Sequence, residues 1–306
     1  VSVHHSASSC RPPGWPAEAA ELLFLNLGLP SQARDLPAAL ALGLALAGRR
    51  RAAGVAALVL CAVLGLRWAA FEAATAELPP PGPGPRIVFA NIWRHNPDPE
   101  GDLARLLAAR PDALLLTEAN AEMRARLAAA LEAGGAAAAG YALRPGAEPW
   151  MPRAVIARVA ATPARDLSAR HGLTPNLQPW RLPRPCAAPA VLALMHLGSP
   201  LAGGRMAGLE RTLAPRRGLA AAETLAIGDF NATPGSTALA KVEAALGVSR
   251  IGDRLPSFLP AWVPLRRLLL PMIGLRIDHA LVGPALAGAR ARLLPLAGSD
   301  HHALAV

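Results

Sequence analysis

The chain has 306 residues, 53% of them apolar, so it can bury a large core, and disorder along its whole length is excluded. Its formal net charge of +10 favours anionic partners, such as phosphodiesters or lipid headgroups, without choosing between them. The three cysteines, Cys10, Cys61 and Cys186, are far apart, which excludes the spacing of a zinc site or of a disulfide framework and leaves the redox compartment open.

The N-terminal part of the chain carries a membrane signal. Residues 1–35 lack the basic start and apolar core of a cleavable signal peptide, and we interpret them as a weakly ordered lead-in. We assign residues 36–71 to the membrane. Within them, residues 52–71 form an apolar run with one charge that is about 30 Å long as a helix, enough to cross a bilayer. Residues 36–48 are too short for a second span by themselves, so one or two spans stay open.

The flanks of this run predict its orientation. The cluster Arg49–Arg51 is expected to stay on the cytoplasmic side, so the chain after residue 71 would face outward. The alternative is that residues 52–71 form a buried core helix. Residues 72–85 include the sequence ELPPPGPGP, which supports neither a helix nor a central strand, and we expect a linker there. Residues 86–306 would then form one domain.

Short apolar runs alternate with amphipathic stretches in that domain. We expect strands at residues 86–91, 112–118, 190–197, 224–230, 276–282 and 302–306, and helices at residues 98–110 and 121–133. Residues 134–140 and 160–190 have too weak a pattern to be placed. The alternation predicts a mixed α/β fold.

Polar residues cluster at the ends of the expected strands, where a rigid scaffold presents side chains to a cleft. They are Asn91, Glu118, His196, Asp229, Asn231, Asp278, His279, Asp300 and His301. Each one alone is more typical of a turn, a helix cap or a hydrogen-bonded structural group. Together they form an oxygen-rich set of the kind that Mg²⁺ prefers. A histidine paired with an aspartate becomes a better acid or base, which suggests Asp278 as the partner of His301.

Six short sequences, in this order, resemble the signature blocks of the endonuclease/exonuclease/phosphatase superfamily, which includes deoxyribonuclease I. They are NIW, LLLTE, MHL, GDFNATP, RIDHAL and GSDHHAL. The resemblance covers residues 86–306, and GDFN before a proline together with SDH near the C-terminus is the specific pair. A membrane segment and a proline-rich linker before such a domain are similar to a bacterial membrane-anchored subgroup.

The resemblance implies a four-layer αββα sandwich behind an N-terminal transmembrane segment. It implies a Mg²⁺-dependent phosphoric ester hydrolase, with Mn²⁺ as a possible substitute, acting on nucleic acid or on a phospholipid headgroup. The protein would lie in a bacterial inner membrane with its catalytic domain facing the periplasm. The sequence indicates no particular protein partner.

The resemblance also assigns a metal side and a substrate side to the site. Glu118 would bind the metal ion, Asp300 would complete the metal side, and Asn91 would support the ion or its waters. Asn91 and Asn231 would contact substrate, with Asn231 holding the scissile phosphate.

Four further residues receive catalytic roles from the resemblance. Asp229 would orient or deprotonate the attacking water, and His196 would assist the leaving group. His301 would stabilise charge on a phosphate oxygen, with Asp278 as its partner.

The GDFNATP sequence itself has a local interpretation. Gly228 would allow a tight exit from the strand, Asp229 and Asn231 would face one cleft, and Pro234 would turn the chain away.

Several residues depart from the family pattern. Trp93 stands where some members have an acidic metal ligand, and Asn96 would either compensate or be a loop residue. Arg153 and Arg158 are either phosphate contacts or part of a solvated face. The apolar insert at residues 258–275 either packs inside the domain or meets the membrane surface.

These departures keep two other functions open. Trp93 favours a catalytically silent module, tethered to the membrane, that binds a phosphorylated ligand. The apolar insert favours a membrane-tethered scaffold for a partner protein.

Overall fold

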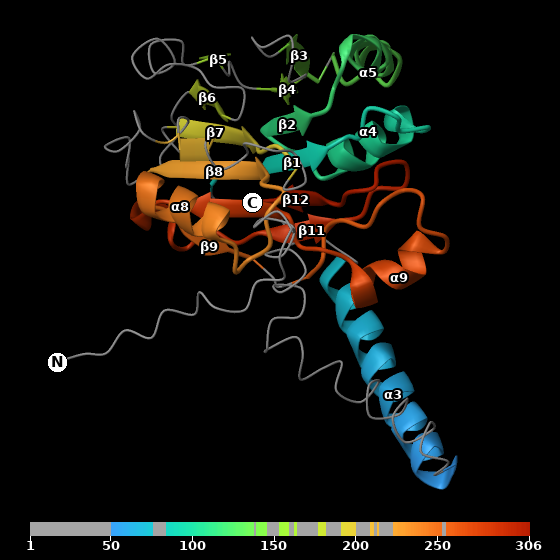
Figure 1. The fold of residues 1–306 in the computed structure, drawn as a ribbon. Helices are drawn as coiled ribbons and strands as arrows, with labels where there is room; N and C mark the ends of the chain where they lie inside the picture. The colour runs from blue at the N-terminus through green and yellow to red at the C-terminus, as the bar shows by residue number, and fades with distance from the viewer. Residues whose placement is uncertain are drawn as a thin grey trace, which may run out of the picture.

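The computed structural model describes residues 50–75, 84–137, 139–145, 153–158, 162–163, 177–181, 191–199, 209–210, 213, 223–252 and 255–306. These residues form two six-stranded sheets packed face to face, with helices on the outer sides (Figure 1). The expected lead-in at residues 1–35, the apolar run at residues 36–48 and the proline-rich part of the expected linker lie outside the described residues.

The first sheet contains both the first strand of the domain and the last strand of the chain. Its order is β11 (Arg292–Leu294), β12 (Ala303–Ala305), β1 (Ile87–Asn91), β2 (Ala113–Thr117), β4 (Arg153–Ala157) and β3 (Ala142–Pro145). β1 and β2 are parallel, and the other neighbours are antiparallel. Helices α4 (Pro99–Ala108) and α5 (Ala121–Ala133) pack on its outer face.

The second sheet repeats this arrangement. Its order is β5 (Thr162–Pro163), β6 (Leu177–Arg181), β7 (Val191–His196), β8 (Thr224–Asp229), β10 (Asp278–Val282) and β9 (Ser249–Ile251). β7 and β8 are the parallel pair. Helix α8 (Thr237–Leu246) covers its outer face, and a 3₁₀ turn, η2 (Pro284–Leu286), follows β10.

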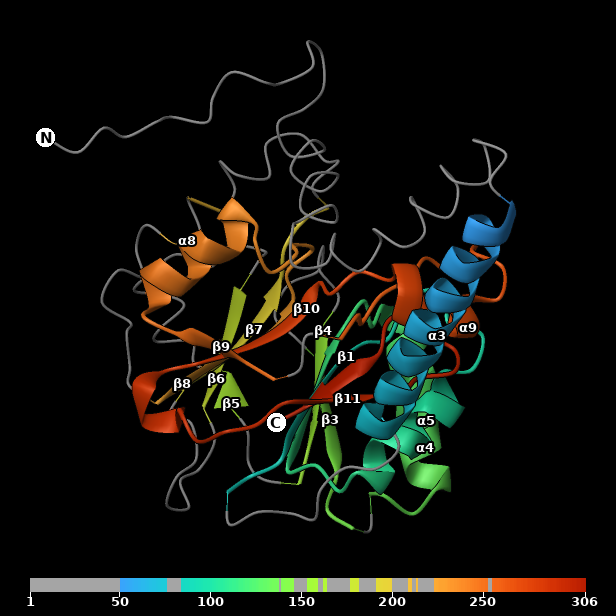
Figure 2. The ribbon, with the colours of Figure 1, turned by 90° about the horizontal axis from the view of Figure 1, so that it is seen from below.

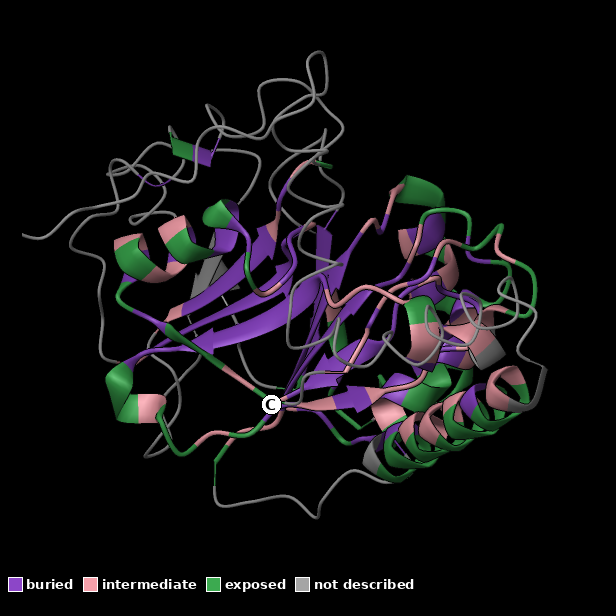
Figure 3. Ribbon diagram, turned by 60° about the horizontal axis from the view of Figure 1, so that its bottom comes forward, coloured by how far each residue is buried: buried purple, intermediate pink, exposed green. Residues whose placement is uncertain are grey.

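The alternation of side chains along each strand explains the four layers. On β1, Ile87 and Phe89 belong to the core between the sheets, whereas Val88 packs under the helices. On β8, Leu225 and Ile227 face the first sheet in the same way. Because both faces are buried, the central strands are apolar almost throughout, as Figure 3 shows by their colour. The αββα sandwich expected from the family resemblance is therefore confirmed.

The strongly patterned elements form close to where the sequence predicts them. The side chain of Asp98 caps α4 by accepting from the Gly101 amide, and that of Asn120 caps α5 by accepting from the Met123 amide. The sequence does not predict α8, although Ser236 caps its start and Gly247 ends it in the left-handed conformation. The short outer strands β3, β4, β5, β6, β9 and β11 are also missed, because most have too few residues to show a period.

A long helix, α3 (Arg50–Thr75), projects from the sandwich beside the shorter α9 (Arg266–Ile273) (Figures 1 and 2). It contains the predicted run at residues 52–71 and continues for four residues into the expected linker at residues 72–85. Those four residues, EAAT, contain no proline or glycine, so nothing in them ends the helix. Phe71, near its C-terminal end, packs into the core between the sheets.

Candidate active site

The predicted residues meet at one end of the sandwich, where the core between the two sheets opens. Asn91 follows Ile87 and Phe89 on the same face of β1, and Asp229 follows Leu225 and Ile227 on the same face of β8. The period of two along a strand therefore turns both polar side chains toward the space between the sheets. His196 at the end of β7 and Asp278 at the start of β10 have the same parity.

Asn91 connects the two sheets by hydrogen bonds. Its side-chain nitrogen donates to Glu118 Oε1 at 3.1 Å and to Asp229 Oδ2 at 3.2 Å. Its oxygen accepts from the backbone amide of Trp93 at 3.0 Å, which fixes this orientation of the side chain. Because Glu118 and Asp229 accept hydrogen bonds from the same nitrogen, their carboxylates lie close enough together to share a bound cation. Asn91 itself presents a donor to the site, not an oxygen.

His301 and Asp278 form the pair expected from the sequence. His301 Nδ1 lies 2.8 Å from Asp278 Oδ2, and both side chains are almost completely buried. On the other side of the ring, Nε2 lies 3.9 Å from Asp229 Oδ2 and 4.0 Å from Asp300 Oδ1. The imidazole is thus held by one aspartate while its second nitrogen faces the carboxylates of the cleft.

These contacts shift the pKa values in opposite directions. Burial raises the pKa of Asp229 to about 7, against the opposing charge of His301. Burial disfavours a charged His301, but the charge and hydrogen bond of Asp278 outweigh it and raise the pKa of His301 to about 10. The site therefore combines a histidine that is cationic at neutral pH with a carboxyl group that exchanges its proton near neutral pH.

Glu118 and His196 approach each other beside Asp229. His196 Nε2 lies 3.9 Å from Glu118 Oε1 and 3.8 Å from Asp229 Oδ2. Burial lowers the pKa of His196 to about 4, so its ring is neutral at pH 7. Burial also disfavours a charged Glu118, but the hydrogen bonds from Asn91 and the Arg94 amide, together with the nearby histidines, outweigh it and lower the pKa of that carboxyl. Glu118 is therefore ionised and available as a ligand.

The donor set fits a hard divalent cation. Glu118, Asp229 and Asp300 supply carboxylate oxygens without sulfur. Within the described part of the chain, Asp300 Oδ1 is buried and has no hydrogen-bond partner, as expected of an oxygen that belongs to a cation. Asp229, Asp278 and His301 also offer ligand atoms within 4.8 Å of one another. Within that group, His301 and Asp278 already bond to each other.

Backbone strain is concentrated around the cleft. Among the described residues, five that are not glycine have positive φ, and three of these are at the site: Trp93 at 53°, Glu118 at 58° and Asn231 at 46°. This conformation costs on the order of 1–2 kcal/mol for most L-residues and persists where the surroundings fix it. Glu118 directly follows β2, and Trp93 and Asn231 lie two residues after the ends of β1 and β8, so each strained residue is at the point where a strand leaves its sheet.

Gly228 and Asn231 of the GDFNATP sequence have structural roles that differ from those expected. Gly228 does not have positive φ; it is needed because a Cβ there would collide with the Met195 carbonyl of β7. The tight exit occurs instead at Asn231, whose amide donates to Asp229 Oδ1 at 2.7 Å. The Asn231 side chain donates to the Leu197 carbonyl at 2.8 Å and to Asp229 Oδ2 at 3.3 Å. Asp229 and Asn231 do lie side by side, as predicted.

Two residues that the sequence did not single out hold the loop before His301. Asp102, buried at the start of α4, accepts from the backbone amides of residues 297, 298 and 299 at 2.7–3.0 Å. Ser299 Oγ donates to the Asn91 carbonyl at 2.7 Å and accepts from the His301 amide at 3.1 Å. Nothing in the local sequence indicates these roles, because Asp102 and its partners are almost two hundred residues apart.

Asn96 and Trp93, two of the departures from the family pattern, both have structural explanations. Asn96 is buried and donates to the Ile92 carbonyl at 3.0 Å and to Asp102 at 2.9 Å, so it is a loop residue and does not replace the acidic ligand. Trp93, at the position of that ligand, contributes its backbone amide to Asn91.

The two arginines differ from each other. Arg158 binds Asp112 at 2.9 Å on the surface, beside the Tyr141 ring. Arg153 is 1% exposed, so it is not part of a solvated face. Arg153 lies opposite Thr117 in the sheet, and Thr117 directly precedes Glu118. The positive charge of Arg153 helps to lower the pKa of His196.

His279 stands apart from the site although it follows Asp278. It has the opposite parity on β10, and its Nε2 lies 2.7 Å from the Ala232 carbonyl, with the Phe230 ring beside it. Burial, aided by the charge of Arg276, lowers the pKa of His279 to about 3. It is a neutral structural histidine.

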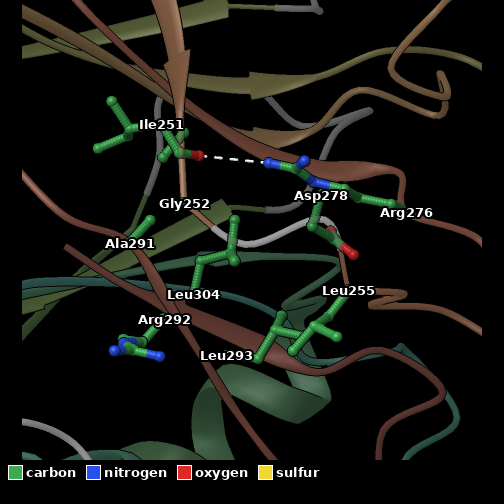
Figure 4. A pocket seen from close by; sticks show the side chains of 10 residues that line it. Ile251, Gly252, Leu255, Arg276, Asp278, Ala291, Arg292, Leu293 and Leu304 are labelled. Carbon is green, nitrogen blue, oxygen red and sulfur yellow. Dashed lines mark hydrogen bonds between the residues drawn. The ribbon is translucent and has the colours of Figure 1, made fainter. Parts of the chain in front are cut away.

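A small pocket lies behind Asp278, between the sheets (Figure 4). Leu255, Leu293 and Leu304 give it apolar walls, and Arg276 at its rim donates to the Ile251 carbonyl at 3.3 Å. Apolar surroundings strengthen the attraction between Asp278 and His301, because little water screens it.

Comparison with known proteins agrees with this geometry. The model of the Endonuclease/Exonuclease/phosphatase family matches residues 88–301. The chain is similar in fold to a 3′ phosphatase from Neisseria bound to a product DNA hairpin, with 14% identity, a TM-score of 0.53 and coverage of 72% of this chain and 98% of the other. It is also similar to an AP endonuclease from Archaeoglobus fulgidus, with 15% identity, a TM-score of 0.51 and coverage of 72% and 97%.

A search of curated protein sequences gave no match. The family model spans about two thirds of the chain and includes every residue of the candidate site from Asn91 to His301. The chain therefore belongs to the endonuclease/exonuclease/phosphatase family.

Proposed function

We propose that this protein is a membrane-anchored hydrolase of phosphoric esters that uses Mg²⁺, with Mn²⁺ as a substitute. One observation carries the proposal: Asn91 holds Glu118 and Asp229 together directly beside the His301–Asp278 pair. Members of the family are phosphoester hydrolases, and this arrangement supplies the parts that such chemistry needs: carboxylates for a cation, a base and a cationic group.

Glu118 and Asp300 would hold the cation, and Asn91 would keep the Glu118 carboxylate in place. When bound, the cation would offset negative charge on the phosphoryl oxygens and make a bound water more acidic. Asp300 is suited to this position because burial raises its pKa, against the charge of His301, and a positive ion would compensate that burial.

Asp229 would receive a proton from the attacking water, since its raised pKa makes it a base that works near neutral pH. His301, kept cationic by Asp278, would stabilise the negative charge that develops on a phosphoryl oxygen. His196 would assist the leaving group. Asn231 would orient the scissile phosphate with its side-chain amide, which would exchange its long 3.3 Å bond to Asp229 Oδ2 for a bond to a phosphoryl oxygen.

The anchor would be α3. Ala52–Ala73 has a mean hydropathy of 2.0 over its most apolar window, and only 11% of that window is buried in the structure. A core helix of a soluble domain would be mostly buried, so the exposure supports a lipid environment (Figure 3). With the arginine cluster at residues 49–51 on the cytoplasmic side, the domain would face the periplasm of a bacterium.

The substrate would be a phosphodiester or phosphomonoester in nucleic acid or in a phospholipid headgroup. The similar proteins from Neisseria and Archaeoglobus fulgidus are a DNA-bound phosphatase and an AP endonuclease, which favours nucleic acid. Attachment to a bilayer favours the lipid. The net charge of +10 suits both.

The test uses the full chain in detergent micelles, because Phe71 of the anchor packs into the core of the domain. After removal of metals with EDTA, the protein is incubated with bis(4-nitrophenyl) phosphate, plasmid DNA and phospholipid vesicles, with and without Mg²⁺ or Mn²⁺. We expect metal-dependent hydrolysis of at least one substrate, and no hydrolysis by Asp229→Asn. Tight binding of phosphate esters without hydrolysis under any of these conditions would instead identify a silent binding module.

A further inference from the structure

The insert at residues 258–275 has one face in the core and another in solvent. Leu259 and Leu270 are buried in the cluster that contains Phe71 of α3, and Val263 and Leu269 pack against it. In contrast, Trp262 is 82% exposed and Leu265 is 72% exposed. A third apolar side chain, Ile273, ends α9 and is also exposed. The sequence predicted that the insert either packs inside the domain or meets the membrane surface. One face does pack inside the domain, and the other face is exposed.

Leu265 has a strained backbone conformation, and its side chain is exposed. Its φ is 55°, and it occupies the N-cap of α9 without forming a side-chain hydrogen bond there. A leucine with left-handed φ costs about 1–2 kcal/mol, which a glycine would avoid. Neither capping nor packing offsets this cost, since the side chain is mostly in solvent. A partner that covers the side chain would offset it.

The length of α3 determines which partner lies nearby, given the membrane anchoring proposed above. Ala52–Ala73 is about 33 Å long as a helix, and the hydrocarbon core of a bilayer is about 30 Å thick. Phe71 and Thr75 are buried against the domain, so no spare helical turn separates the domain from the bilayer. The surface beside Phe71 must then lie at the membrane interface, and α9 and β11 are the elements that pack on α3 (Figures 1 and 2).

We propose that residues 260–266 dock into the headgroup region of the same bilayer that α3 spans, through Trp262 and Leu265. Tryptophan is the residue most typical of this depth, because its ring is apolar and its N–H is polar. The proposal rests on α3 as a membrane anchor, and it concerns a surface separate from the hydrolytic residues.

The docked segment and the two residues before it, Phe258 and Leu259, contact the loop that carries Asp300 and His301. The Phe258 ring packs on the His301 ring with centroids 4.6 Å apart, and the Leu259 amide donates to the Asp300 carbonyl at 3.2 Å. The Arg266 guanidinium donates to the carbonyls of Ser299 and Ala297. On the other side, the Phe71 ring of α3 lies 5.7 Å from the His302 ring. The loop that carries Asp300 and His301 is therefore held between the anchor and the docking segment, at a fixed height above the lipid.

The experiment measures the surroundings of residues 262 and 265 in the full-length protein. In a background with Cys10→Ser, Cys61→Ser and Cys186→Ser, the chain carries Trp262→Cys or Leu265→Cys, labelled with the fluorophore NBD. The control is Ala244→Cys, which is exposed on α8, at the far side of the domain from α3 in Figures 1 and 2. Each protein is reconstituted in vesicles of phosphatidylcholine and phosphatidylglycerol, with or without bromine on the lipid chains.

We expect blue-shifted emission and about twofold quenching by brominated lipid at residues 262 and 265, because interfacial side chains reach about 5–10 Å into the membrane. The probe at residue 244 should report water. Equal, water-like emission at all three positions would overturn the proposal. Shielding that disappears on dilution of the protein in the membrane would also overturn it, because a second copy of the chain would then be the partner.

The outcome is independent of hydrolysis. Adding Asp229→Asn to each labelled chain should leave the quenching unchanged, so loss of catalysis alone contradicts only the proposed enzymatic function. A chain that fails to float with the vesicles overturns the anchor and the docking together. A chain that floats but shows no quenching at residues 262 and 265 overturns the docking alone.

Discussion

The site and the α3–α9 corner, which comprises α3 and the insert at residues 258–275, are stabilised by different interactions. At the site, charged groups are buried and held by hydrogen bonds, as in the His301–Asp278 pair. At the corner, apolar side chains such as Phe71 and Leu270 pack against each other. Buried charges cost free energy of folding, whereas buried apolar surface supplies it. We therefore expect substitutions in the two regions to separate activity from stability.

The largest expected effect is on activity. Asp229→Asn keeps the shape of the side chain but removes the base, so the rate of bis(4-nitrophenyl) phosphate hydrolysis should fall by about 10³-fold or more. The free energy of unfolding should change little, because relief of the burial of a charged carboxylate is offset by the loss of hydrogen bonds from Asn91 and Asn231. Hydrolysis assays and denaturant unfolding in detergent test this. A variant that retains a tenth of the activity would show that Asp229 is not the base.

His301→Asn should affect both properties. It leaves Asp278 buried without its cationic partner, which should lower the free energy of unfolding by about 3 kcal/mol, along with a loss of activity of about 10²-fold or more. The control is the double variant His301→Asn with Asp278→Asn, which should recover most of the stability and none of the activity. Equal stability of the single and double variants would contradict a strong ion pair.

Leu270→Ala should lower stability and leave activity largely unchanged. Deleting this buried side chain should lower the free energy of unfolding by about 3 kcal/mol while the folded protein keeps most of its activity. The matched control on the same helix is Ile273→Ala, which is exposed and should change stability by less than about 0.5 kcal/mol. Thermal unfolding followed by circular dichroism distinguishes the two.

Two of the buried histidines, His279 and His301, should give opposite dependences of stability on pH. The pKa of His279 is lowered to about 3, so its contribution is present above its unfolded pKa of about 6.5 and is lost as the pH falls toward 3. The pKa of His301 is raised to about 10, so its contribution is present below about pH 6.5 and is lost as the pH rises toward 10.

His279→Gln isolates the first of these effects. Between pH 7.5 and 5.5 the wild-type chain should lose about 1 kcal/mol more of its unfolding free energy than this variant, because only the wild type has a histidine at position 279 that gains a proton on unfolding. Denaturant titrations at the two pH values measure the difference. An identical loss in both proteins would mean that His279 titrates normally in the folded state.

The smallest expected effect is at Leu265. Leu265→Gly should leave the stability in detergent unchanged or raise it by up to about 1 kcal/mol, since glycine adopts a φ of 55° without the steric cost. Leu265→Ala removes the same side chain but keeps most of that cost, so it serves as the control. Lower stability of the glycine variant than of the alanine variant would show that left-handed strain at this position is negligible.

The sequence predicts some strands and motifs, but it does not predict the roles of several other residues. The runs that became β1, β2, β7, β8 and β10 are visible because both faces of these strands are buried, which makes them apolar throughout. The motifs around Asn91, Asp229 and His301 indicate the family. Asp102, Ser299 and Arg153 are not visible in this way, because their partners lie on other elements far along the chain.

The sequence by itself determined the apolar strands, the capped helices α4 and α5, the 20-residue apolar run and the identity of the polar residues at the strand ends. These features depend on local periodicity and composition, which neighbouring residues express directly. Only the tertiary structure decided that His301 is cationic and His279 neutral, that Gly228 makes room for a backbone, and that the insert faces both the core and the solvent. Those properties depend on which atoms meet across the sandwich, and a linear pattern does not specify such contacts.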